Sequence, residues 1–262
     1  MRAAAIALLA ACGGSSSVGT DTGRPGAPPP RAAHFDYQLG GAYPPPAGTT
    51  VVARDREAPP LRGFYNICYV NGFQTQPGEA AWWLAEHPDL ILRDAGGAPV
   101  VDAAWDEMLL DIRTPARRAE LAGIMGRWIA GCADAGYDAV ELDNLDSYTR
   151  SRGLLAADEA VAAMRAFATS AHARALAVAQ KNAPDLVARR DELATDFAIV
   201  EECEDTHECD GYIAGYGGYV LDVEYARPPF EAGCASSRQM SIVLRDRDLV
   251  TPDEAGYLYA GC

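Results

Sequence analysis

Several short motifs that mark large enzyme classes are missing from the sequence. It contains no glycine-rich phosphate loop and no Gly-x-Ser-x-Gly turn, so it gives no support to nucleotide-dependent chemistry or to a serine hydrolase of that type. Histidine is scarce, and His34, His87, His172 and His207 are too scattered to form a metal cluster. We therefore expect neither a metal ion nor a cofactor.

Positive charge is scarce as well. Lys and Arg number 22 against 37 Asp and Glu, which gives a formal net charge of -15. Nucleic acids and anionic lipid head groups attract Lys and Arg, so this excess of acid argues against both as partners. It suits a cationic or neutral partner, although many exported proteins are acidic only for solubility.

No apolar run is long enough to remain in a bilayer as a helix. The first residues predict an export signal instead, because Met1-Arg2 is basic, Ala3–Ala11 is a short apolar run, and Leu9-Ala10-Ala11-Cys12 resembles the lipobox of bacterial lipoproteins. We interpret residues 1–11 as a lipoprotein-type signal peptide and Cys12 as its lipidation site. An ordinary signal peptide is the alternative. Residues 12–34, rich in Gly, Ser and Pro, predict a disordered linker. The protein would then be exported and held at the cell envelope only through a lipid anchor.

Six cysteines remain beyond Cys12, and an even number in an oxidising compartment suggests three disulfides. The spacings match no zinc pattern. We predict Cys203–Cys209 as a local clip behind a strand end, and Cys234–Cys262 as a bridge that holds the chain end. Cys68, in a strand, and Cys132, on the apolar stripe of a helix, form the third predicted pair, with two buried free thiols as the alternative.

Short β-prone runs alternate with helical stretches over residues 35–262, which predicts an α/β fold: one single-domain (β/α)8 barrel of the TIM type. The candidate strands are Phe35–Leu39, Thr50–Arg54, Gly63–Val70, Met108–Ile112, Asp138–Leu142, Leu176–Lys181, Phe197–Glu201, Tyr219–Glu224 and Met240–Leu244. Eight are needed, so we assign Met108–Ile112 to a long connection.

Helices are expected after Thr114-Pro115, over Ala156–Ala175 and over Pro184–Leu193. The first of them carries an apolar stripe that includes Cys132. Thr251-Pro252-Asp253-Glu254 resembles a capping box and predicts a last short helix.

Charged residues collect where the predicted strands end, which is the rim on which barrel enzymes build their active sites. Glu141 and Asp143 share one face of their strand, Glu201 ends the next strand but one, and Lys181 ends the strand between them. We expect Asp143 and Glu201 to be catalytic. Glu141 lies a layer deeper, and we interpret it as part of an ion-pair lattice with Lys181.

At these residues the chain resembles a known family. The segment Gly136-Tyr137-Asp138-Ala139-Val140-Glu141-Leu142-Asp143-Asn144-Leu145-Asp146 is similar to the signature of glycoside hydrolase family 114, the endo-α-1,4-polygalactosaminidase type. Further matches follow in order at Tyr37-Gln38-Leu39, Cys68-Tyr69, Ala171-His172, residues 176–182, residues 196–203, Glu208-Cys209 and Val223-Glu224-Tyr225. The resemblance implies a barrel that cleaves α-1,4-linked galactosamine polymers, with catalytic carboxylates at Asp143 and Glu201. Residues 70–77, Glu202 and residues 204–207 depart from the family pattern, and these positions lie in the expected substrate loops.

We therefore expect Asp143 to be the nucleophile, kept charged by Lys181, and Glu201 to be the acid/base, while the sequence leaves retention or inversion open. Trp82, Trp83 and Trp105 are candidates for stacking on sugar rings. The other candidate substrate-binding residues are Gln38, Tyr69, Asp111, Asn144, Asp146, Tyr148, Lys181, Asn182 and Glu224. The partner would be an amino-sugar polysaccharide, and the protein a monomer. The alternatives are a glycosidase of this fold acting on another α-linked sugar, and a lipoprotein that binds polysaccharide without cutting it.

Overall fold

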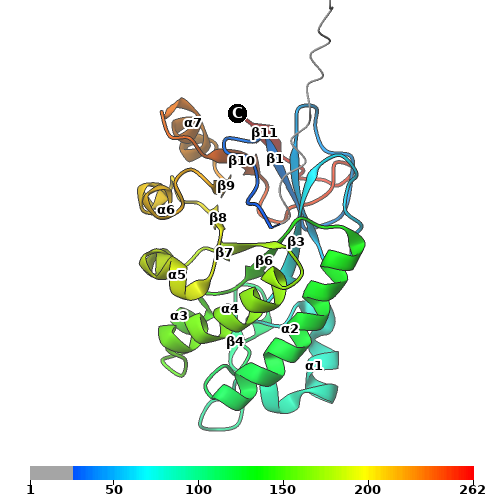
Figure 1. Cartoon of the computed structure of the whole chain (residues 1–262), viewed down its shortest axis with the longest axis vertical. Helices are drawn as coiled ribbons and strands as arrows, with labels where there is room; N and C mark the ends of the chain where they lie inside the picture. The colour runs from blue at the N-terminus through cyan, green and yellow to red at the C-terminus, as the bar shows by residue number, and fades with distance from the viewer. Residues whose placement is uncertain (1–25) are drawn as a thin grey trace, which may run out of the picture.

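Eight short strands lie side by side and parallel in the computed structural model, which describes residues 26–262. They are β1 (Phe35–Gln38), β2 (Val51–Asp55), β3 (Tyr65–Asn71), β6 (Ala139–Asp143), β7 (Ala177–Lys181), β8 (Phe197–Glu201), β9 (Val220–Glu224) and β10 (Ser241–Arg245). Their order in the sheet follows their order in the chain, so the sheet curls into a nearly closed barrel with helices around it (Figure 1). The eight predicted strands and the TIM-type barrel are confirmed.

Small and aromatic side chains fill the inside of the barrel. Phe35, Ile67, Ala139, Ala179 and Phe197 belong to one buried apolar cluster there. Because successive strand side chains point to opposite faces, the alanines on β6 and β7 put Glu141, Asp143 and Lys181 on the same inner face, one and two layers higher. The charged groups therefore sit at the carboxyl ends of the strands.

Helices cover the outside of β6 to β10. They are α2 (Pro115–Ala135), α3 (Ser147–Arg150), α4 (Ala157–His172), α5 (Arg190–Leu193), α6 (Cys209–Tyr216) and α7 (Arg227–Ala235). The side chain of Thr114 caps α2, Pro115 opens it, and Gly136 ends it with a φ of 98°. The predicted stripe is buried, including Leu121, Ile129 and Cys132. The stretch predicted as a helix over Pro184–Leu193 begins as the 3₁₀ helix η3 (Pro184–Arg189) and becomes α-helical only in α5.

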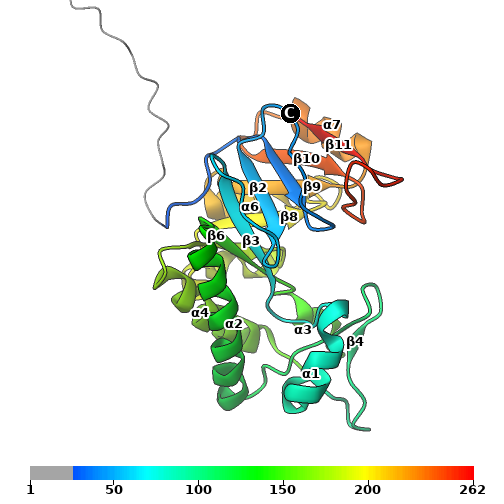
Figure 2. The same cartoon turned by 90° about the vertical axis from the view of Figure 1, so that its right-hand side faces the viewer.

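The first part of the barrel departs from the regular pattern, because loops rather than helices connect β1 to β2 and β2 to β3 (Figure 2). On their outer face, Arg54 donates to Gln38 Oε1 at 2.9 Å and to the carbonyl of Tyr43 at 2.8 Å. Gln38 in turn donates to Asp36 at 2.8 Å. Gln38 therefore belongs to a buried polar network on the outside of the barrel.

A long excursion separates β3 from β6. It contains η1 (Pro77–Glu79), α1 (Ala80–Glu86), η2 (Pro88–Leu90) and the antiparallel pair β4 (Val101–Asp102) and β5 (Glu107–Met108). Met108–Ile112 thus belongs mainly to a connection, as expected. On α1, Trp83 is fully buried and Trp82 is exposed.

The barrel closes at a seam between β1 and β10. The strand β11 (Tyr259–Gly261) pairs antiparallel with β10, and the Tyr259 hydroxyl reaches the carbonyl of Phe35 at 3.4 Å. Arg245, fully buried, pairs with Asp36 across the seam at 3.2 Å. The last helix predicted after Thr251 is wrong: Glu254 does bond to Thr251, but Gly256, with a φ of 96°, turns the chain toward β11.

The predicted signal peptide, Cys12 and most of the predicted linker lie outside the described residues. Residues 26–34, expected to be part of the linker, instead contact the barrel. The Tyr65 hydroxyl donates to the carbonyl of Ala27 at 2.7 Å, and the Arg31 guanidinium lies 4.2 Å from the ring centroid of Tyr219. None of the helices within residues 26–262 combines the length and the apolar character needed to cross a membrane.

The three predicted disulfides are confirmed. Cys68–Cys132 joins β3 to α2, Cys203–Cys209 closes the loop between β8 and α6, and Cys234–Cys262 joins α7 to the chain end after β11. Such bridges are typical of proteins in oxidising compartments, which agrees with an extracellular protein.

Candidate active site

A pocket of about 440 Å³ lies at the carboxyl ends of the barrel strands. Its floor contains three charged strand-terminal side chains from neighbouring strands, namely Asp143 of β6, Lys181 of β7 and Glu201 of β8. The β4–β5 hairpin forms one wall, with Trp105 at its tip. The segment after β10 forms another. This is the rim at which barrel enzymes bind their substrates.

The ammonium group of Lys181 lies among three carboxylates at the pocket floor. Its Nζ lies 3.0 Å from Asp143 Oδ1, 3.1 Å from Glu201 Oε2 and 3.5 Å from Glu141 Oε1. Burial lowers the pKa of Lys181, but the three carboxylates outweigh burial and raise this pKa well above its ordinary value. Lys181 is therefore a permanent cation that holds the catalytic candidates together.

Asp143 is held as a carboxylate. Burial acts to raise its pKa, but Lys181, the Tyr69 hydroxyl and the Asn144 backbone N–H outweigh burial and lower the pKa. Tyr69 donates to Oδ2 at 2.7 Å, and the Asn144 N–H donates to Oδ1 at 2.7 Å. These fixed donors keep Asp143 charged at neutral pH, which a nucleophile or a charge-stabilising group requires.

Glu201 is held by neighbours on both sides. The Asn182 side chain donates to Oε2 at 3.1 Å and accepts from the Glu201 backbone N–H at 2.9 Å. The Tyr225 hydroxyl donates to Oε1. The Glu201 side chain is about a quarter exposed, so substrate has access to it.

Glu141 lies one layer below and has no exposure to solvent. It accepts from the Tyr37 hydroxyl at 2.5 Å, while its Oε2 has no partner among the described residues. Burial raises the pKa of Glu141 to about 7, against the opposing effect of Lys181. The contact with Lys181 agrees with the ion-pair role predicted for it.

The chain turns sharply after each of the three charged strand ends. Asn144, Asn182 and Glu202 have φ values of 64°, 44° and 58°, in the left-handed region that residues other than glycine rarely adopt. Such strained backbone persists only where its surroundings hold it, and it clusters at functional sites.

Seven of the predicted site residues line the pocket: Asp143, Glu201, Tyr69, Asn144, Asp146, Lys181 and Asn182. The other four do not. Gln38 lies in the outer polar network, Asp111 pairs with Arg113 at 2.6 Å beside the start of α2, and the Tyr148 hydroxyl donates to Asp185 at 2.7 Å. Glu224 points to the outer face of β9, where it accepts from the Glu204 backbone N–H at 2.8 Å.

The pocket also contains residues that sequence reasoning missed. Tyr37 and Tyr225 continue the inward phase of Phe35 and Val223, and that phase could have identified them. Asp102, Glu107, Arg150, Arg247 and Asp248 come from connections, for which the sequence carries no comparable signal. Trp105 lines the pocket and is 51% exposed, whereas Trp82 and Trp83 do not line it.

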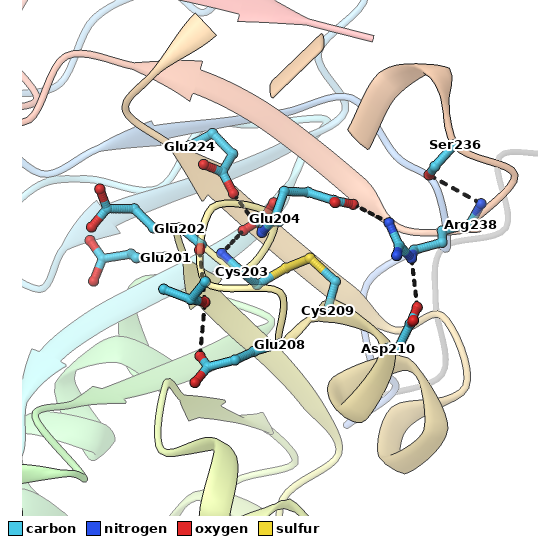
Figure 3. Close-up of a disulfide and its surroundings, with 12 residues drawn as sticks. Glu201, Glu202, Cys203, Glu204, Glu208, Cys209, Asp210, Glu224, Ser236 and Arg238 are labelled. Atoms are coloured by element: carbon cyan, nitrogen blue, oxygen red, sulfur yellow. Dashed lines mark hydrogen bonds and ion pairs between the residues drawn. A yellow bond between two sulfur atoms is a disulfide. The ribbon is translucent and has the colours of Figure 1, made fainter. Parts of the chain in front are cut away.

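The Cys203–Cys209 disulfide lies behind the turn that carries Glu201 (Figure 3). Two buried acids on β9 hold the same loop, because Asp222 accepts from the Cys203 N–H at 3.3 Å and Glu224 from that of Glu204. Cys203, Cys209 and Asp222 are close enough to share a metal ion, but both sulfurs are used in the disulfide. This cluster therefore holds the loop in place, and its sulfurs are not available to bind a metal ion.

Two carboxylates that face an open pocket at the rim of a barrel are the arrangement with which glycoside hydrolases cleave their substrates. The sequence profile of glycoside-hydrolase family GH114 matches residues 17–262, and the chain belongs to this family. The resemblance seen in the sequence is thereby confirmed, and the protein is a glycoside hydrolase.

Solved structures show the same fold. The structure of Ega3 from Aspergillus fumigatus in complex with galactosamine aligns with 88% of this chain and 95% of its own, at a TM-score of 0.70 and 21% identity. The glycoside hydrolase domain of PelA from Pseudomonas aeruginosa aligns with 85% of this chain and 98% of its own, at a TM-score of 0.56 and 17% identity. A search of curated proteins found no match.

Proposed function

We propose that this glycoside hydrolase cleaves α-1,4-linked galactosamine polymers, with Asp143 as nucleophile and Glu201 as acid/base. The observation that carries this proposal is the position of both carboxylates around one lysine at the pocket floor. Three donors contact each carboxylate, those around Asp143 lower its pKa, and Glu201 is the more exposed of the two.

We extend the proposal to retention of configuration, because one lysine nitrogen holds both carboxylates close together. One oxygen of Asp143 and one of Glu201 lie within about 3 Å of the same nitrogen, so these two oxygens are at most about 6 Å apart. Retaining enzymes place their carboxyl groups about 5 Å apart, while inverting enzymes need about 6.5–9.5 Å to admit a water.

The proposed cycle has two steps. Asp143 attacks the anomeric carbon, the glycosidic C–O bond breaks, and Glu201 acts as the general acid that gives a proton to the leaving oxygen. Water then attacks the glycosyl-enzyme ester, Glu201 takes a proton from that water, and the Asp143 carboxylate is released. Tyr69 and Asn144 hold Asp143 in place throughout.

Charge supports an amino-sugar substrate. The acids at the pocket outnumber its cations, and each cation has an acidic partner: Lys181 binds Asp143, Arg150 binds Asp146 at 2.8 Å, and Arg247 binds Glu202 at 2.5 Å. An ammonium-bearing sugar would meet unneutralised carboxylates there. Galactosamine is also the ligand in the Ega3 structure, whose fold this chain shares.

The test is a reducing-sugar assay with polymers of galactosamine, N-acetylgalactosamine and neutral α-linked sugars. Asp143→Asn and Glu201→Gln should each remove nearly all turnover while the circular dichroism spectrum stays that of the parent. Substantial activity in either variant would refute the assignment. Cleavage of neutral polymers only would point to a glycosidase for another α-linked sugar, and binding without cleavage would point to a polysaccharide-binding protein.

We also propose that the enzyme is an exported monomer, anchored by lipid at Cys12 after removal of residues 1–11. The lipobox-like segment supports the lipid anchor, and the disulfides support export. Mass spectrometry of the mature N-terminus tests the anchor, since an unmodified Cys12 or cleavage elsewhere would contradict it.

A further inference from the structure

A buried carboxylate beside the catalytic pair has no cation to neutralise it. Glu107 of β5 is only 7% exposed, yet it forms no ion pair with any described residue. Burying an unpaired charge is costly, and native proteins pair such charges or use them. Burial raises the pKa of Glu107 to about 7, with Asp143 and Asp102 adding to this effect and Asn71 and Arg150 opposing it.

Neutral amides hold one oxygen of this carboxylate. Asn71 and Asn144 donate to Glu107 Oε2 at 2.9 Å and 3.2 Å. Gln74, with its amide in the orientation that satisfies its neighbours, donates to the same oxygen at 3.0 Å and accepts from Arg150. The carboxylate is therefore fixed in direction without being neutralised.

The other oxygen, Oε1, has no donor among residues 26–262, and Glu107 lines the pocket. Arg150, whose charge opposes the rise in the pKa of Glu107, is already paired with Asp102 at 2.9 Å and with Asp146 at 2.8 Å. A ligand that enters the pocket thus meets a preformed acceptor whose negative charge lacks a counter-ion.

The surroundings of Glu107 match a sugar ring that bears an amine. Asn144 connects Glu107 to the residue before it, Asp143, so the acceptor adjoins the point of cleavage. The exposed ring of Trp105 stands on the same hairpin and offers a flat apolar face on which a pyranose can stack. An ammonium group would supply the missing counter-ion, whereas an acetamide would not.

We propose that Glu107 is the specificity residue that binds the free ammonium group of a hexosamine next to the cleaved bond. This inference rests on the proposed hydrolysis of amino-sugar polymers and identifies the side chain that recognises the amine. The enzyme then prefers free amines over N-acetylated sugars because acetylation removes the charge that Glu107 binds.

The experiment compares Glu107→Gln with the parent on galactosamine and N-acetylgalactosamine polymers. The glutamine keeps the shape of the side chain but removes its charge. We expect kcat/KM for the free-amine polymer to fall about tenfold to a hundredfold, as for loss of a charged hydrogen bond, and kcat/KM for the acetylated polymer to stay within about twofold. Glu231→Gln, an exposed site on α7, makes the same charge change outside the pocket and should alter neither.

Binding gives a second readout that does not depend on turnover. In the Glu201→Gln background, adding Glu107→Gln should weaken binding of a galactosamine oligomer, but not of its N-acetylated form, in isothermal titration calorimetry. An unchanged amine preference in Glu107→Gln would overturn the inference while leaving the hydrolase assignment intact. So would a parent enzyme that treats both polymers alike. Activity that survives Asp143→Asn would instead overturn the proposed catalytic pair.

Discussion

Glu141 should make the barrel less stable as the pH rises, and Glu141→Gln should remove this effect. Burial raises the pKa of Glu141 from 4.5 to about 7. The folded protein therefore holds a proton more tightly than the unfolded chain does. The stability that this proton contributes is fully present below pH 4.5 and is lost as the pH rises through about 7. The loss amounts to about 3 kcal/mol.

Urea unfolding of parent and Glu141→Gln, followed by tryptophan fluorescence at several pH values, measures this effect. Between pH 4.5 and pH values above 7, the free energy of unfolding should shift by about 3 kcal/mol in favour of the variant. The amide of the variant also lacks a partner at the position of Oε2, which lowers the stability of the variant. This cost does not depend on pH, so it cancels when the two pH values are compared. If the difference in the free energy of unfolding between variant and parent stays constant with pH, or moves in favour of the parent, burial does not raise the pKa of Glu141.

Three further outcomes follow from the site and the disulfides. Replacing Cys68 and Cys132 together by Ser should lower the free energy of unfolding by about 4 kcal/mol, against about 2 kcal/mol for Cys203 and Cys209, because the loops close 64 and 6 residues. The loss of kcat should follow the opposite order, since only the second bridge adjoins Glu201; equal losses would refute this. Tyr225→Phe should lower kcat about tenfold by removing a hydrogen bond to Glu201, and steady-state kinetics that show a change in KM alone would contradict that role. The parent's kcat/KM for the free-amine polymer should fall below about pH 7 as Glu107 takes up a proton, and a pH–rate profile with the same limb in Glu107→Gln would exclude Glu107 as its source.

The strands of the barrel were predictable because each is a short apolar run bounded by turn residues. Phe197–Glu201 agrees residue for residue with β8. Their charged ends, at Asp143, Lys181 and Glu201, were predictable for a related reason: parallel strands bring their carboxyl ends to one rim. That geometry is independent of the loops, so it can be inferred without them.

Which face of a strand points into the barrel was harder to infer. The pattern shows that Asp222 and Glu224 share a face, but both faces of a barrel strand are buried, so the pattern does not say which face points inward. In the structure Leu221 and Val223 fill the interior, and Glu224 therefore lies behind the pocket. Gln38 was misplaced in the same way.

Most pocket residues that lie far from a strand end could not be placed, with Trp105 as an exception. Glu107 and Arg150 meet at the pocket because the excursion after β3 folds back over the rim, and this depends on packing between segments distant in sequence. The turn after Thr251 shows the same limit for local signals. The capping contacts form, yet pairing of β11 with β10 decides the path of the chain.

The backbone turns after the strand ends explain how this site stays in order with so much like charge. Left-handed conformations at Asn144, Asn182 and Glu202 each cost about 1 kcal/mol or more, and asparagine tolerates them best. In return, the turn at Asn144 aims its N–H at Asp143, and the turn at Asn182 lets one amide hold both the backbone and the carboxylate of Glu201. At Glu202, which is not an asparagine, the N–H donates to the carbonyl of Val223 at 2.9 Å and the side chain pairs with Arg247. The Cys203–Cys209 bridge begins at the next residue, so the most strained of the three turns is also the one with a covalent clip. Strain and the disulfide together hold Glu201 within reach of Lys181.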